Sequence, residues 1–115
     1  MRHISLVLSL LFALGHAASC TPGSNVSREL GARCQSHDEC DDVCLPDPEF
    51  PDGFCSVNCN SAADCPGGAR CVAIGQGVCL FGCLEPTDCE FLGPGWRCAT
   101  TPALPGGEED VCVGP

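Results

Sequence analysis

Cysteine is the residue type with the most chemical potential in this chain, which has thirteen cysteines among 115 residues. Thiols at such density bind metals or form disulfides, and spacing together with compartment distinguishes the two. No Cys-x2-Cys pair occurs, which disfavours a zinc site. An oxidising compartment also converts thiolates to disulfides before a metal can hold them. The cysteines therefore predict disulfides.

Side chains for acid–base catalysis are scarce. After residue 19, His37 is the only histidine, and the chain has neither lysine nor tyrosine. General acid–base and triad mechanisms need such groups in combination. We interpret the neighbours of His37, Asp38 and Glu39, as solvated turn residues. The sequence thus predicts a protein that is not an enzyme and carries no cofactor.

An acidic run at residues 38–42 is the one place where calcium binding can be argued, through Asp38, Glu39, Asp41 and Asp42. The spacing does not match the EF-hand loop, and a solvated charge run is the simpler interpretation. We therefore predict no metal site and keep calcium as the weaker alternative. The formal net charge of −10 disfavours nucleic acid and anionic membrane surfaces as partners.

Twelve cysteines divide into three groups of four with a repeating pattern. In every group five residues separate the first two cysteines, and three residues join successive groups. An acid precedes each second cysteine, as Glu39, Asp64 and Asp88. We predict a signal peptide (1–19), an anchor cysteine with a flexible tether (20–33), module one (34–55), module two (56–79) and module three (80–115).

Local signals predict few regular elements. Ser36 with Glu39 and Ser61 with Asp64 fit the capping box, and Glu85-Pro86 with Asp88 is equivalent, so each module should open with a short helical turn. Prolines make the last segments of modules one and three poor strands, whereas Val72, Ile74 and Val78 predict a hairpin in module two. Large apolar residues are sparse, and we expect disulfides to replace a conventional core. The predicted fold class is small and disulfide-rich, with short helical turns and small β-hairpins.

The pairing of the cysteines is open to three patterns per module. A helical turn between the first two cysteines directs them to different sides and disfavours a bond between them. We predict first-to-third and second-to-fourth bonds, and the nested pattern, first-to-fourth with second-to-third, stays open. The predicted bonds are Cys34–Cys44, Cys40–Cys55, Cys59–Cys71, Cys65–Cys79, Cys83–Cys98 and Cys89–Cys112.

The N-terminus carries the marks of export. Arg2 and His3 precede an uncharged apolar run and then small residues, which is typical of a secretory signal peptide. Residues 17–20, Ala-Ala-Ser-Cys, resemble the bacterial lipobox, which predicts lipid on Cys20. Pairing between molecules and a free thiol are the alternatives for this odd cysteine. The sequon Asn25-Val26-Ser27 has meaning only in a eukaryotic secretory pathway.

A family resemblance rests on the Cys-x5-Cys spacing, on Cys-Pro-Gly-Gly-Ala-Arg-Cys at residues 65–71 and on Gly-Val-Cys-x3-Cys at residues 77–83. These strings look like the cysteine-rich repeats of predicted bacterial surface lipoproteins. A looser similarity is to the N-terminal cysteine-rich region of Dickkopf proteins. The resemblance covers residues 31–115 and implies an architecture but no activity.

These observations predict a noncatalytic protein that is held at the outer membrane or cell surface by lipid on Cys20, or that is secreted. It would present a stiff acidic three-module rod for structural or adhesive contacts with an unknown protein or surface. One alternative is a soluble secreted ligand or protease inhibitor that offers the loop of residues 45–54 or 99–111, and another is a calcium-dependent binder. We expect the minor core of module three, and the contact surface where exposed, to consist of Phe81, Phe91, Leu92 and Trp96.

Overall fold

The computed structural model describes residues 26–115. The predicted signal peptide, Cys20 and the sequon asparagine lie outside the described residues. Short 3-10 turns and strands make up the described part, in the order η1 (His37–Glu39), β1 (Val43–Leu45), β2 (Phe54–Ser56), η2 (Ala62–Asp64), η3 (Pro66–Gly68), β3 (Arg70–Val72), β4 (Val78–Leu80), η4 (Pro86–Leu92), β5 (Arg97–Pro102) and β6 (Glu108–Val113). The predicted small disulfide-rich fold is confirmed.

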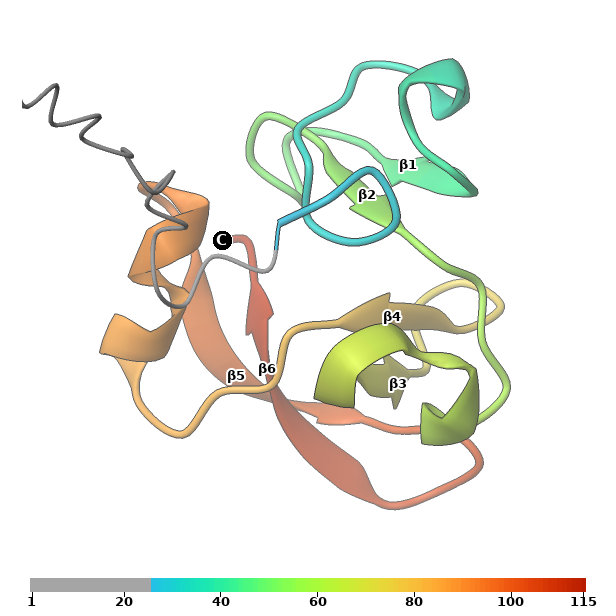
Figure 1. The fold of residues 1–115 in the computed structure, drawn as a ribbon. Coiled ribbons are helices and arrows are strands. Elements are labelled where there is room, and N and C mark those ends of the chain that lie inside the picture. Colours follow the sequence, from blue (N-terminus) through green and yellow to red (C-terminus); the bar gives the residue numbers. More distant parts are fainter. Residues whose placement is uncertain (1–25) are drawn as a thin grey trace, which may run out of the picture.

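The same unit recurs in each group of four cysteines: a 3-10 turn begins between the first two, and an antiparallel hairpin carries the third and fourth (Figure 1). The predicted opening turns are therefore present. Capping boxes form at η2 and η4, through Ser61 with Asp64 and Glu85 with Asp88. The η1 turn differs, because Ser36 and Glu39 form no capping box there.

Hairpins form in all three modules, so the expectation that prolines prevent strands in modules one and three is wrong. Pro46, Pro48 and Pro51 lie in the connection between β1 and β2, where no ladder hydrogen bond needs their missing N–H. Pro102 occupies the last pair of the β5–β6 ladder, opposite Glu108. With six pairs, this ladder is the longest of the three.

The segment before each first cysteine pairs with the strand that carries the fourth. Its carbonyl accepts a hydrogen bond from the fourth cysteine's N–H: Cys55 to Ala32 at 2.8 Å, Cys79 to Val57 at 3.0 Å and Cys112 to Phe81 at 2.9 Å. We call these residues, 31–33, 57–58 and 81–82, the edge segments. Two of them are also links between modules. The constant length of the links follows from this double use, since an extra residue would shift the pairing register.

Six disulfides, two within each unit, have Cα–Cα separations between 5.3 and 6.0 Å, within the usual range. The third and fourth cysteines stand opposite each other in the ladders, as in the pair Cys44↔Cys55, and therefore face the same side of the hairpin. One bonds the first cysteine and the other the second. The resulting bonds are Cys34–Cys44, Cys40–Cys55, Cys59–Cys71, Cys65–Cys79, Cys83–Cys98 and Cys89–Cys112, which is the crossing pattern in every module.

One core is shared by the three modules. Phe54, Leu80 and Val111, one from each of β2, β4 and β6, are at most 1% exposed and belong to one buried cluster. The Phe54 ring lies 5.3 Å from the Trp96 ring of module three, centroid to centroid. The β5–β6 hairpin also reaches past β3 (Figure 1). The expectations of a rod and of no conventional core are therefore wrong, because modules that cannot each fill a core pool their sparse apolar residues.

The predicted flexible tether extends too far into the fold. Leu30 is 4% exposed and belongs to the shared core. The backbone N–H of Gly31 donates to the carbonyl of Cys55 at 2.8 Å, and Ala32 accepts from the same residue. Residues 27–33 are thus part of module one, because an apolar leucine and a backbone free to pair with β2 both gain from docking.

Candidate contact surface between modules two and three

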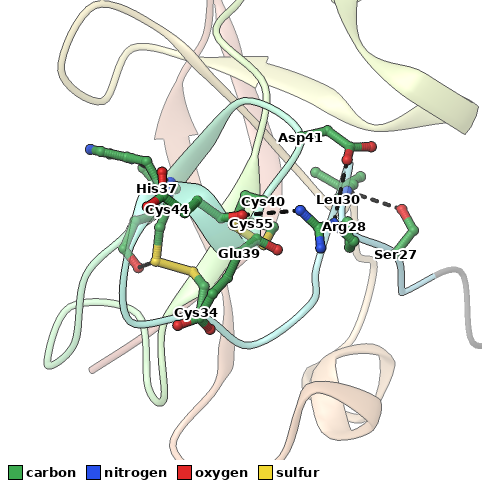
Figure 2. Close-up of a disulfide and its surroundings, with 12 residues drawn as sticks. Ser27, Arg28, Leu30, Cys34, His37, Glu39, Cys40, Asp41, Cys44 and Cys55 are labelled. Carbon is green, nitrogen blue, oxygen red and sulfur yellow. Dashed lines mark hydrogen bonds and ion pairs between the residues drawn. A yellow bond between two sulfur atoms is a disulfide. The ribbon is translucent and has the colours of Figure 1, made fainter.

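The acidic run of module one has an internal counter-ion, Arg28. Its Nε lies 3.5 Å from Oδ1 of Asp41 (Figure 2). Its Nη2 donates to the backbone carbonyl of Asp38 at 3.1 Å. The carboxylates of Glu39 and Asp42 instead accept hydrogen bonds from separate backbone amides. Within residues 26–115, the groups of three metal-ligating side chains close enough for one ion all consist of disulfide-bonded cysteines. The four carboxylates of the calcium alternative therefore do not gather around one point.

His37 has a structural partner that the sequence did not indicate. Its Nδ1 accepts a hydrogen bond from the backbone N–H of Cys44, at 2.9 Å (Figure 2). Cys55, opposite Cys44 in the ladder, directs its own N–H and carbonyl to residues 31–32, so the Cys44 N–H points away from β2. His37 thus provides an acceptor for the Cys44 N–H on the outer edge of β1. Because Nδ1 accepts this bond, the ring carries a proton on Nε2.

The four apolar residues proposed as a minor core or a contact surface divide between these roles. Leu92 is buried, and Phe81 and Trp96 are partly buried against the shared core. Phe91 packs edge-on against Phe81, with the ring centroids 5.1 Å apart, and 41% of Phe91 is exposed. Three of the four therefore pack in or against the shared core, and Phe91 is the one that is exposed at the surface.

Phe91 lines a groove of about 490 Å³ between modules two and three. Leu84, one residue after Cys83, also lines it and is 91% exposed. Among residues 26–115 the exposed large apolar side chains are these two and Val26. The sequence analysis did not single out Leu84, because its exposure, the feature that points to a contact, is visible only in the structure. The groove lining comprises residues 67–70, 81–84, Asp88, Phe91, Glu109 and Asp110.

The groove is acidic. Three acidic residues line it, Asp88, Glu109 and Asp110, against the single arginine Arg70, whose Nε lies 3.4 Å from Glu109 Oε2. The backbone N–H groups of Leu84 and Glu85 donate to Asp88 Oδ2 at 2.8 and 3.0 Å. These two bonds lower the pKa of Asp88 below its ordinary value, because they stabilise the ionised carboxylate.

Each element around the groove is held by a different constraint. The glycines of η3 give one wall of exposed backbone, with Gly67 and Gly68 at positive φ. The edge segment at Gly82 forms the floor beside β6, to which it is bridged through Val111. The η4 turn supplies Asp88 and Phe91 and is fastened by the bond between Cys89 and Cys112. The groove is thus a preformed feature of the module junction.

The chain is a small disulfide-rich protein whose modules share a core. Comparisons with protein-family models, with curated proteins and with solved structures find no match. The resemblance to surface lipoprotein repeats and to Dickkopf proteins therefore stays a prediction. None of the helices in residues 26–115 is long and apolar enough to cross a bilayer.

Proposed function

We propose that this chain is a noncatalytic extracytoplasmic protein that is anchored to a membrane by lipid on Cys20 and makes contacts with another surface. The six disulfides carry the proposal, because bonds of this number form and persist in oxidising compartments. They use twelve of the thirteen cysteines and leave Cys20 outside these bonds. Lipid on Cys20 accounts for that remainder, and the small residues before it fit such processing.

The contact role is supported by the side chains left at the surface. Leu84 and Phe91 lie on the same groove, while most other large apolar side chains of residues 26–115 are buried or partly buried. An apolar pair beside a hollow is typical of an interaction site. The groove is lined by acidic residues and one arginine, and it has neither a histidine nor a cysteine thiol that could act beside them as base or nucleophile.

The alternative of a soluble ligand or inhibitor with a free loop has less support. Phe50 and Phe54 anchor the loop of residues 45–54 in the shared core. In the loop of residues 99–111, the N–H of Leu104 donates to the carbonyl of Cys71 at 3.1 Å, which ties its tip to module two. Both loops are fastened to the body of the protein, whereas an inhibitor's loop has to enter its target.

The test of anchoring is fractionation of the full chain expressed in its native host. We expect the natural protein to sediment with membranes and Cys20→Ser to be released in a folded state. Ser24→Ala, four residues along, is the matched control and should stay with membranes. Intact mass should show added diacylglycerol and acyl groups only when Cys20 is present. A Cys20→Ser protein that still sediments with membranes, or an unmodified natural chain, would rule out lipid at this residue.

A further inference from the structure

The geometry points to the groove between modules two and three as the docking site for a cationic segment of another protein, with lysine or arginine side chains around an apolar residue. This inference rests on the contact role proposed above and names the site and the class of partner. Three features carry it: the exposed apolar pair, the imbalance of charge along the groove, and the preformed wall of backbone beside them.

The apolar part of the docking site is Leu84 together with Phe91. Leu84 is 91% exposed, so almost its whole side chain remains available for burial by a partner. Phe91 is 41% exposed, and its ring is held in place by the edge-on contact with Phe81. A fixed aromatic ring loses little freedom on binding, and its face attracts a cation. The volume of about 490 Å³ is in the range of sites that take a few side chains.

The charged part favours a cation. Arg70 is already paired with Glu109, so its charge is compensated within the groove. The carboxylates of Asp88 and Asp110 accept hydrogen bonds from uncharged donors only: backbone amides for Asp88 and the hydroxyl of Thr100 for Asp110. Two of the acidic residues that line the groove thus have no cationic partner. Positive charge on the partner complements them, and negative charge is repelled.

The same charges disfavour the other possible occupants. A second copy of this chain would bring a further charge of −10 to the contact. An anionic bilayer surface would be repelled for the same reason, although a membrane-anchored protein lies near one. A neutral apolar ligand would leave the carboxylates facing it without compensation. A cationic protein segment is the occupant that fits both the apolar and the charged part.

Peptide titration followed by nuclear magnetic resonance tests the inference. The protein is the isotope-labelled Cys20→Ser variant of the full chain, exported and oxidised by its host, so that lipid plays no part. One probe has lysines on both sides of a leucine, and its partner probe has glutamates in place of the lysines. We expect the lysine peptide alone to shift the backbone amides of Gly67, Gly82 and Leu84, and raised salt to weaken its binding.

Two variants with one matched control locate the site. Leu84→Ser should weaken the lysine peptide by about tenfold or more, since that side chain is buried only on binding. Glu109→Gln leaves the charge of Arg70 uncompensated in the groove and should weaken the peptide by about two- to fivefold, whereas Glu108→Gln, at the neighbouring exposed acid outside the groove lining, should not. Thermal unfolding without reductant checks that each variant is folded.

Three results would overturn the inference. Equal shifts by the glutamate peptide would remove the charge argument, and no shift at the groove by either peptide would remove the site. Concentration-dependent shifts at the same amides without peptide would make a second copy the occupant. None of these depends on the membrane fractionation, so the docking site and the anchor can fail separately.

Discussion

Removing the ring of Phe54 tests whether the three modules share one core. Phe54 is 1% exposed and lies between Phe50 at 6.2 Å, Phe81 at 5.8 Å and Trp96 at 5.3 Å, measured between ring centroids. A buried phenylalanine replaced by alanine typically costs about 3–5 kcal/mol, from lost transfer free energy and from the cavity left behind. The neighbouring rings belong to modules one and three, and Phe54 shares its buried cluster with Val72 and Val78 of module two, so Phe54→Ala should destabilise all three modules.

The assay is equilibrium unfolding in guanidinium without reductant, followed by the fluorescence of Trp96, the only tryptophan. Trp96 belongs to module three and Phe54 to module one, so the probe and the perturbation are in different modules. We expect one transition, with its free energy of unfolding lowered by about 3–5 kcal/mol. Phe91→Ala is the control. With 41% of that residue exposed, its loss should cost about 1–2 kcal/mol.

An unchanged Trp96 transition in Phe54→Ala would refute the shared core. The same holds for two separate transitions, one of which keeps the midpoint of the natural protein. Either outcome would mean that the modules unfold independently, as units of a rod do, and that the aromatic contacts between them contribute little to stability.

Three further changes test local features. The pKa of Asp88 in the folded protein is lowered from 3.8, so its ionised carboxylate contributes stability above pH 3.8 that is lost as the pH falls through the folded-state pKa. Asp88→Asn removes this contribution, so the melting temperature of the variant, measured from pH 2 to 6, should fall less steeply at acidic pH than that of the natural protein. Gly77→Ala should cost about 1–3 kcal/mol in denaturant unfolding, since φ is +112° and the new Cβ would meet the carbonyl of Cys59, whereas Gly75→Ala meets open space and should cost about 1 kcal/mol. His37→Ala should cost about 0.5–1.5 kcal/mol in the same assay, as water replaces its bond to an edge N–H.

The cysteine register predicted pairing within modules and left the nested pattern open, and the reason given for preferring the crossing pattern does not hold. The opening turns are 3-10 turns of three residues at η1 and η2, and Cys40 and Cys65 that follow them are extended. A six-residue helical rotation between the first two cysteines is therefore not what separates them. The hairpin ladders matter more, because they place the third and fourth cysteines side by side on one face.

Capping chemistry was predictable where the side-chain length was right. Asp64 and Asp88 reach back to two amides each, at residues 60–61 and 84–85. Glu39 is one methylene longer, and its carboxylate bonds only the N–H of Gln35, at 3.4 Å. The capping-box pattern in the sequence accepts Glu and Asp alike at this position, but in these short turns only Asp bonds the two amides.

The shared core and the groove could not be predicted in the same way. They depend on how modules pack against one another, and no periodicity within one module encodes that packing. Phe50 and Phe54 appear in the sequence as residues of a proline-rich loop, yet they are in the centre of the protein. Leu84 appears as a residue between the first two cysteines of module three, and only the fold leaves it uncovered.

The edge segments define which piece of chain can be moved to another protein. A fragment cut from its first to its fourth cysteine would leave behind the residues that pair with its own second strand, such as Val57 and Asn58 for module two. A fragment that begins just after the preceding fourth cysteine and runs to the end of its own second strand, such as residues 56–80, carries its complete sheet. Recombination or protein engineering that respects this cutting point keeps the ladder in register, and a shift by one residue turns each paired side chain to the opposite face.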